Sequence, residues 1–145
     1  MNFQEIRDAW EIDSQVDITE LDEASAKQHS LHAKYFEWYM KERVYLVKLQ
    51  EDMKQLRLRK YEFYTQGPSK EQHDDGWEVP AKGQTILKAE AKQYVEADKD
   101  ISELVIKIEM QKAKVDFLES IVSNLNYRSQ QIKNIIDFLR FKEGG

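Results

Sequence analysis

Residues 54–64 combine cations with aromatic rings, and this combination could bind a nucleic-acid strand. The segment holds seven such side chains: Lys54, Arg57, Arg59, Lys60, Tyr61, Phe63 and Tyr64. Lys and Arg can neutralise successive phosphates, while flat rings stack on unpaired bases, so the pattern suits a single strand better than a duplex. Tyr64 extends the stripe that Lys54, Arg57 and Lys60 or Tyr61 form at helical spacing. The alternative interpretation places Tyr61 and Phe63 in a hydrophobic core and the cations on a solvated helix face.

The segment stands out because the chain as a whole is acidic. It carries 27 acidic and 22 basic residues, for a net charge of −5, which argues against a protein that coats DNA generally. Residues 1–26 hold eight acids and one cation, whereas residues 41–60 hold seven cations and three acids. The acidic N-terminal segment is expected either to stay solvated or to dock on a basic surface of a protein partner.

The positions of glycine and proline predict the elements that hold this segment. All of them fall near the middle or at the end of the chain: Gly67, Pro68, Gly76, Pro80, Gly83, Gly144 and Gly145. The sequence therefore predicts an all-α, hairpin-like subunit with two long helical regions. Residues 1–66 would form the acidic segment and first helix, 67–83 a polar Gly/Pro loop, and 84–145 a C-terminal helical oligomerisation region.

Apolar residues in both regions recur at close to a 3.5-residue period, which is typical of long packed helices. The first helix is predicted to begin near Thr19, an N-cap with Asp22 reaching back to it. The second region is predicted to begin near Thr85, either as one helix or broken near Ala97–Asp100. Its apolar seam comprises Ile101, Leu104, Ile108, Val115, Leu118, Val122, Leu125, Ile132, Ile136 and Leu139.

Further apolar residues of the second region lie outside that seam. They are Val105, Ile106, Phe117, Ile121, Ile135, Phe138 and Phe141. A helix that is apolar on more than one face needs more than one neighbour. We therefore predict a homo-oligomer, with the ten residues of the seam at its interface.

Other kinds of chemistry find little support in the sequence. There is no cysteine, no glycine-rich phosphate loop and no apolar run long enough to cross a membrane. His29 and His32 are three residues apart, but no matching third and fourth metal ligands accompany them. The sequence thus predicts no enzyme, no metal, no cofactor and no membrane partner.

Three parts of the sequence carry a resemblance to a known family, the UvsY recombination mediators of T-even-type bacteriophages. "DITELDEA" followed by "LHAKYFEWY" resembles the family's entry into its first helix. "LRLRKYEFYTQG" resembles its basic segment with an acidic-aromatic-Tyr tail before a glycine loop. "VEADKDISELVIKIEMQKAKVDFLESIVSNL", continuing to "IKNIIDFLRFKEGG", resembles its closing helix with a Gly-rich end. Their order, spacing and total length also agree.

The resemblance implies a function that the periodicity could not. It implies a non-enzymatic protein in the cytoplasm of an infected bacterial host. Such a protein binds single-stranded DNA and helps a phage RecA-like recombinase assemble on strands coated by the phage single-strand-binding protein. It also implies ring-like homo-oligomers of about six or seven subunits, joined through their C-terminal helices.

The family's DNA-contacting segment falls on Leu58, Arg59, Lys60 and Tyr61. This chain has Leu58 where the family has Lys, while cations stand at Arg57 and Arg59. On the residues alone, a rival interpretation stays open: a coiled-coil scaffold or adaptor that binds only proteins.

Overall fold

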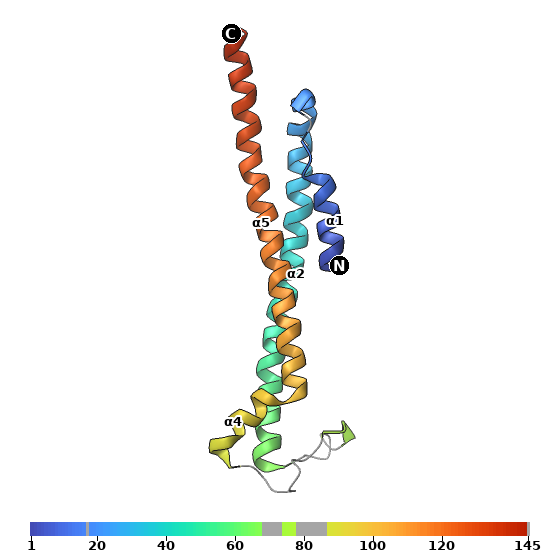
Figure 1. The fold of residues 1–145 in the computed structure, drawn as a ribbon, viewed down its shortest axis with the longest axis vertical. Coiled ribbons are helices and arrows are strands. Elements are labelled where there is room, and N and C mark those ends of the chain that lie inside the picture. The colour runs from blue at the N-terminus through green and yellow to red at the C-terminus, as the bar shows by residue number, and fades with distance from the viewer. Residues whose placement is uncertain (17, 68–73, 78–86, 145) are drawn as a thin grey trace. The chain divides into compact units, whose positions relative to one another are not determined.

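The computed structural model describes residues 1–16, 18–67, 74–77 and 87–144, and the residues described are predominantly helical (Figure 1). In chain order they form α1 (Phe3–Asp13), the short 3-10 helix η1 (Ile18–Glu20), α2 (Leu21–Gln66), α4 (Lys88–Ala97) and α5 (Lys99–Lys142). No strand occurs among the described residues. The predicted all-α class with two long helices is confirmed. Most of the predicted Gly/Pro loop, together with Thr85, lies outside the described residues.

Helix α1 was not predicted, although the sequence carries a signal for it. The Asn2 side chain accepts a hydrogen bond from the backbone N–H of Glu5 at 2.8 Å, and the Glu5 carboxylate accepts one from the Asn2 N–H at 3.0 Å. This reciprocal capping box satisfies two backbone donors that the first helical turn would otherwise leave free. Ile6 and Trp10, one turn apart, then give the short helix an apolar face.

Helix α2 begins at Leu21, close to the predicted start near Thr19. Thr19 lies inside the 3-10 helix Ile18–Glu20, which leads directly into α2 at Leu21. The open question about the second helical region is also settled. Asp98 has an extended backbone (φ −62°, ψ 137°), and this residue ends α4 and separates it from α5.

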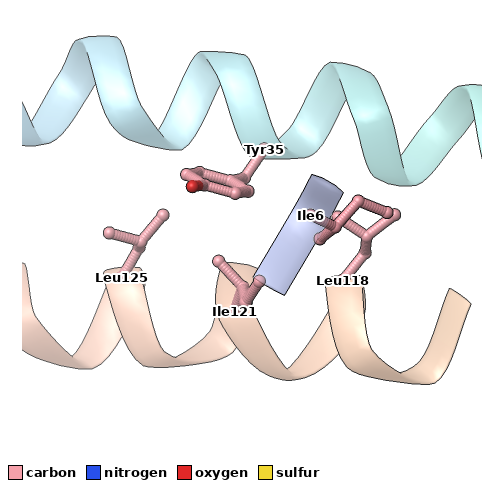
Figure 2. Close-up of a cluster of buried hydrophobic side chains, with 5 residues drawn as sticks. All are labelled: Ile6, Tyr35, Leu118, Ile121 and Leu125. Carbon is pink, nitrogen blue, oxygen red and sulfur yellow. The ribbon is translucent and has the colours of Figure 1, made fainter. Parts of the chain in front are cut away.

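The chain forms two compact units, and the first comprises Met1–Val44 and Lys112–Gly145. Its core is a cluster from three helices: Ile6 of α1, Tyr35 of α2, and Leu118, Ile121 and Leu125 of α5 (Figure 2). Burying an aliphatic or aromatic side chain of this size contributes about 1.5–3 kcal/mol, so α1 adds to the stability of this unit.

Two polar residues of α2 occupy positions where the helical pattern would place apolar residues, and both have polar partners in this first unit. Gln28 is buried and donates from Nε2 to the backbone carbonyl of Leu125 at 2.7 Å. Glu42 lies 3.5 Å from Nζ of Lys114. A buried polar group without a partner would destabilise the fold, and these contacts remove that penalty.

The second unit, Tyr45–Gln111, has its own core. Leu49 and Met53 of α2 pack with Val95 of α4 and with Ile101 and Ile108 of α5. On α2, Met53 belongs to the buried face, whereas its polar neighbour Asp52 is exposed.

Most of the apolar seam of α5 is buried within a single chain. Ile101, Leu118 and Leu125 have no exposed surface, and only Leu139 among the ten predicted interface residues is classed as exposed. Cores of the two units therefore account for most of the seam without a second subunit. The apolar surface left uncovered on α5 includes several residues that lie outside the seam: Val105, Ile106, Ile135, Phe138 and Phe141.

Candidate nucleic-acid interface

The last turns of α2 carry the basic and aromatic segment and divide it between two environments. At about 100° per residue, Lys54, Arg57, Leu58 and Tyr61 fall within about 100° of one another around the helix. All four are exposed. Lys60 points elsewhere, so the four cations of the segment do not form one basic face.

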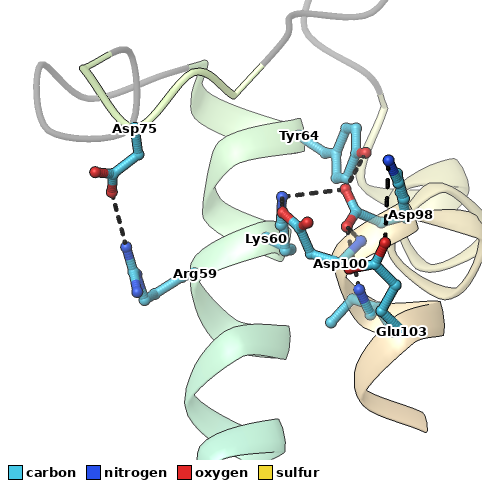
Figure 3. A network of polar contacts seen from close by, with 9 residues as sticks. Arg59, Lys60, Tyr64, Asp75, Asp98, Asp100 and Glu103 are labelled. Atoms are coloured by element: carbon cyan, nitrogen blue, oxygen red, sulfur yellow. Dashed lines mark hydrogen bonds and ion pairs between the residues drawn. The ribbon is translucent and has the colours of Figure 1, made fainter. Parts of the chain in front are cut away.

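Lys60 is buried and held within the subunit. Its Nζ lies 2.8 Å from Oδ2 of Asp100 and 3.3 Å from Oδ2 of Asp98, and its side chain is 4% exposed (Figure 3). The same Nζ lies 3.7 Å from the centre of the Trp77 ring, a favourable cation–π distance. The structure gives Lys60 two carboxylates and an aromatic face, and leaves it no open side for a phosphate.

Asp98 joins this network to the break between α4 and α5. Its Oδ1 accepts hydrogen bonds from the backbone N–H groups of Asp100 and Ile101, at 2.9 and 3.3 Å, and so caps α5. Burial alone would raise the pKa of the Asp98 carboxyl. Hydrogen bonds from Tyr64 and from the Ile101 N–H, with the charge of Lys60, outweigh burial and lower that pKa below its ordinary value.

Tyr64 is therefore part of the fold. Its hydroxyl donates to Oδ2 of Asp98 at 2.6 Å, and its ring packs against Phe63 and Tyr94. Burial and the adjacent Asp98 carboxylate raise the pKa of the Tyr64 hydroxyl, so it stays protonated and remains a donor even well above neutral pH. The choice between stacking and packing, left open by the sequence, falls to packing for Tyr64. Tyr61 stays exposed.

Arg57 and Arg59 project from different sides of α2, about 160° apart. Arg57 Nε lies 3.5 Å from Oε1 of Glu96 on α4, and Arg59 Nη2 lies 3.8 Å from Oδ2 of Asp75 (Figure 3 shows the second pair). Both arginine side chains are about half exposed, at 47% and 46%. Arg59 also lies over the Trp77 ring, with its guanidinium carbon 5.1 Å from the ring centre.

Lys54 has a partner on its own helix. Its Nζ lies 2.8 Å from Oε1 of Glu51, one turn earlier, and both side chains are well exposed. Exposed pairs of this kind contribute about 0.3–0.5 kcal/mol, so Lys54 can leave its carboxylate with little loss.

The two histidines considered as metal ligands, His29 and His32, have no further ligands beside them among the described residues. His32 stacks on Phe36. Within the described ranges, no group of three or more His, Cys, Asp or Glu side chains could hold a metal ion. No helix in that part of the chain is long and apolar enough to cross a membrane.

Comparisons with known proteins identify a family and a fold for the chain. The family model "Recombination, repair and ssDNA binding protein UvsY" matches residues 9–145. Crystal structures of the recombination mediator protein UvsY of bacteriophage T4 have similar folds. One, from lattice type II, gives a TM-score of 0.79 at 21% identity over 100% of this chain and 99% of that chain. Another, from lattice type I, gives 0.77 at 19% identity over 95% and 98%. At these identities the likeness shows the fold. No curated protein sequence matches the chain.

Proposed function

The chain belongs to the UvsY family, and on this premise we propose that it is a recombination mediator that binds single-stranded DNA. In this proposal it helps a RecA-like recombinase assemble on strands that a single-strand-binding protein already coats. The role requires binding alone and no covalent chemistry. It would be carried out in the cytoplasm of an infected bacterial host.

The observation that carries the proposal is the exposed face of α2, which we call the binding face: Lys54, Arg57, Leu58 and Tyr61. Its two cations can contact phosphates, and Tyr61 can stack on an unpaired base. Leu58 is 54% exposed and offers an apolar surface between them. Arg59 would contact the strand from the flank of this face.

Lys60 and Tyr64 have a supporting part in the proposal. Both fasten the end of α2 to Asp98, the residue between α4 and α5. They hold the binding face in place without contacting DNA. This assignment replaces the direct contacts that the sequence predicted for them.

A single binding face offers few phosphate contacts, so the affinity of one subunit is expected to be low and strongly salt-dependent. Several identical faces in a ring-like homo-oligomer would raise the effective concentration and make many weak contacts act together. The proposed interface lies at the C-terminal end of α5, where Ile135, Phe138, Leu139 and Phe141 are exposed. Phe141 is 79% exposed, and large apolar side chains left exposed near one another are typical of an interaction surface.

The path that such an oligomer would impose on a bound DNA strand suggests how mediation would work. A strand held along several binding faces follows the geometry of the oligomer, and that path would disfavour the coating protein and favour the recombinase filament. The acidic residues of the N-terminal segment are candidates for contact with a basic protein partner. One of them, Asp13, is already bonded to Lys34 and Tyr35 within the subunit and is therefore not available.

Fluorescence anisotropy with labelled oligo-dT tests the proposal. The parent protein should bind, and the Arg57→Ala/Lys54→Ala variant should bind more weakly with a flatter dependence on salt, since about 0.7 counterions are released per single-strand contact. Helicity should be unchanged in both proteins. A protein that assembles fully yet ignores oligo-dT at low salt would instead support a scaffold that binds only proteins.

A further inference from the structure

Each exposed arginine of the DNA-binding segment already faces a carboxylate of its own chain, and we infer that Glu96 and Asp75 compete with DNA phosphates for Arg57 and Arg59. This inference rests on the proposed function, because it concerns how the same site is regulated. Arg57 pairs with Glu96 on α4, and Arg59 with Asp75, at 3.5 and 3.8 Å. Neither carboxylate lies on α2, so the competition comes from outside the helix that carries the binding face.

These two pairs have the properties of exchangeable contacts. The Glu96 and Asp75 side chains are about half exposed, like their arginine partners, and the charged atoms lie beyond ideal hydrogen-bond distance. Water and salt reach such pairs, and they stabilise the fold only slightly. The pair between Lys60 and Asp98 differs, because both side chains are less than 10% exposed. The structure thus separates a permanent ion pair from two that a phosphate can replace.

A phosphate that binds either arginine must first displace its carboxylate and then tolerate the acid nearby. Both effects weaken each contact. The intrachain pair is also strongest at low salt, where phosphate binding would otherwise gain most. The carboxylates therefore keep each subunit's grip weak and reduce its dependence on salt. A strand held this way is retained by many subunits together and is released readily by any one of them.

Neutral variants with matched controls test the competition at Arg57. Glu96→Gln should bind labelled oligo-dT about two- to fivefold more tightly than the parent, which corresponds to the strength of one exposed ion pair. Glu90→Gln removes the same charge from the same helix at an exposed position that has no ion pair among the described residues. It should change affinity less than Glu96→Gln does. In an Arg57→Ala background, Glu96→Gln should lose its advantage over Glu90→Gln.

The pair between Arg59 and Asp75 offers an equivalent test. Asp75→Asn should tighten binding, and its neighbour Asp74 provides the control Asp74→Asn, since Asp74 is exposed and has no ion pair within the described part of the chain. The advantage of Asp75→Asn should vanish in an Arg59→Ala background. Equal effects of each variant and its control, or an advantage that persists without the arginine, would overturn the inference. The parent protein binding oligo-dT in the same assay would show that the proposed function itself still stands.

Discussion

The hydroxyl of Tyr64 donates a 2.6 Å hydrogen bond to Oδ2 of Asp98, the residue that separates α4 from α5. The other carboxylate oxygen of Asp98 caps the first turn of α5. One side chain thus connects the end of α2 to the start of α5, and Lys60 neutralises its charge. The residues that the sequence grouped as a DNA contact therefore fall into two sets. Lys60 and Tyr64 hold the fold together, and the exposed residues remain available to a ligand.

Replacement of Lys60 should destabilise the protein far more than replacement of an exposed cation. Lys60→Met leaves the Asp98 carboxylate buried beside no cation, and breaking a buried pair from one side costs roughly 3 kcal/mol. Lys54→Met removes a solvent-exposed partner and should cost less than about 0.5 kcal/mol. Urea denaturation of both variants at neutral pH measures the difference. Equal free energies of unfolding would mean that the Lys60 pair contributes nothing.

The pH dependence of stability should reveal the bond between Tyr64 and Asp98. The pKa of Asp98 is lowered in the folded protein, so its stabilisation is present above the ordinary carboxyl pKa near 3.8 and is lost as pH falls through the lowered value. Tyr64→Phe removes a hydrogen bond to a charged group and should cost about 1.5 kcal/mol at pH 7. Urea denaturation should show that this difference shrinks towards pH 2. A difference that stays constant with pH would contradict the assignment.

The two tyrosines should behave oppositely towards DNA. Tyr61→Ala removes an exposed ring from the binding face and should weaken oligo-dT binding, by about 1–3 kcal/mol if the ring stacks on one base. Tyr64→Phe keeps a ring that is already packed and should leave DNA affinity unchanged. Anisotropy of both variants at one salt concentration decides between the roles. Loss of affinity in Tyr64→Phe with Tyr61→Ala unaffected would reverse them.

The sequence predicted the two long helices well because their buried residues recur at helical spacing. Ile108, Leu118 and Leu125, for example, lie in the predicted seam of the second region and are all buried. The same reasoning could not find the partner of Lys60. Asp100 is 40 residues away, and only the packing of α5 beside α2 brings the two together.

Periodicity also could not distinguish contacts within a chain from contacts between chains. Helices pack by the same rules in both cases. Leu118 and Leu125 were predicted at an oligomer interface, yet the core of one subunit covers them completely. The apolar residues outside the seam, such as Phe138 and Phe141, stay mostly exposed and are therefore the better candidates for contact with a second subunit.

Charged substitutions on α5 should separate folding from assembly. Phe138→Asp with Phe141→Asp places charges on exposed positions, so the subunit should keep its helicity while the oligomer dissociates. Leu118→Asp places a charge in the core of the first unit and should unfold the protein, because a buried unpaired charge is strongly destabilising. Sedimentation velocity and far-UV circular dichroism report assembly and helicity separately.

An exposed apolar residue elsewhere provides the control for this last experiment. Ile12→Asp changes a residue of α1 that is 72% exposed and should leave both assembly and helicity intact. If the α5 variant is a folded monomer, its affinity for oligo-dT should fall by at least about tenfold, since the binding faces no longer act together. A folded monomer that binds as tightly as the parent would show that one binding face is sufficient. Dissociation by Ile12→Asp would instead place the interface at α1.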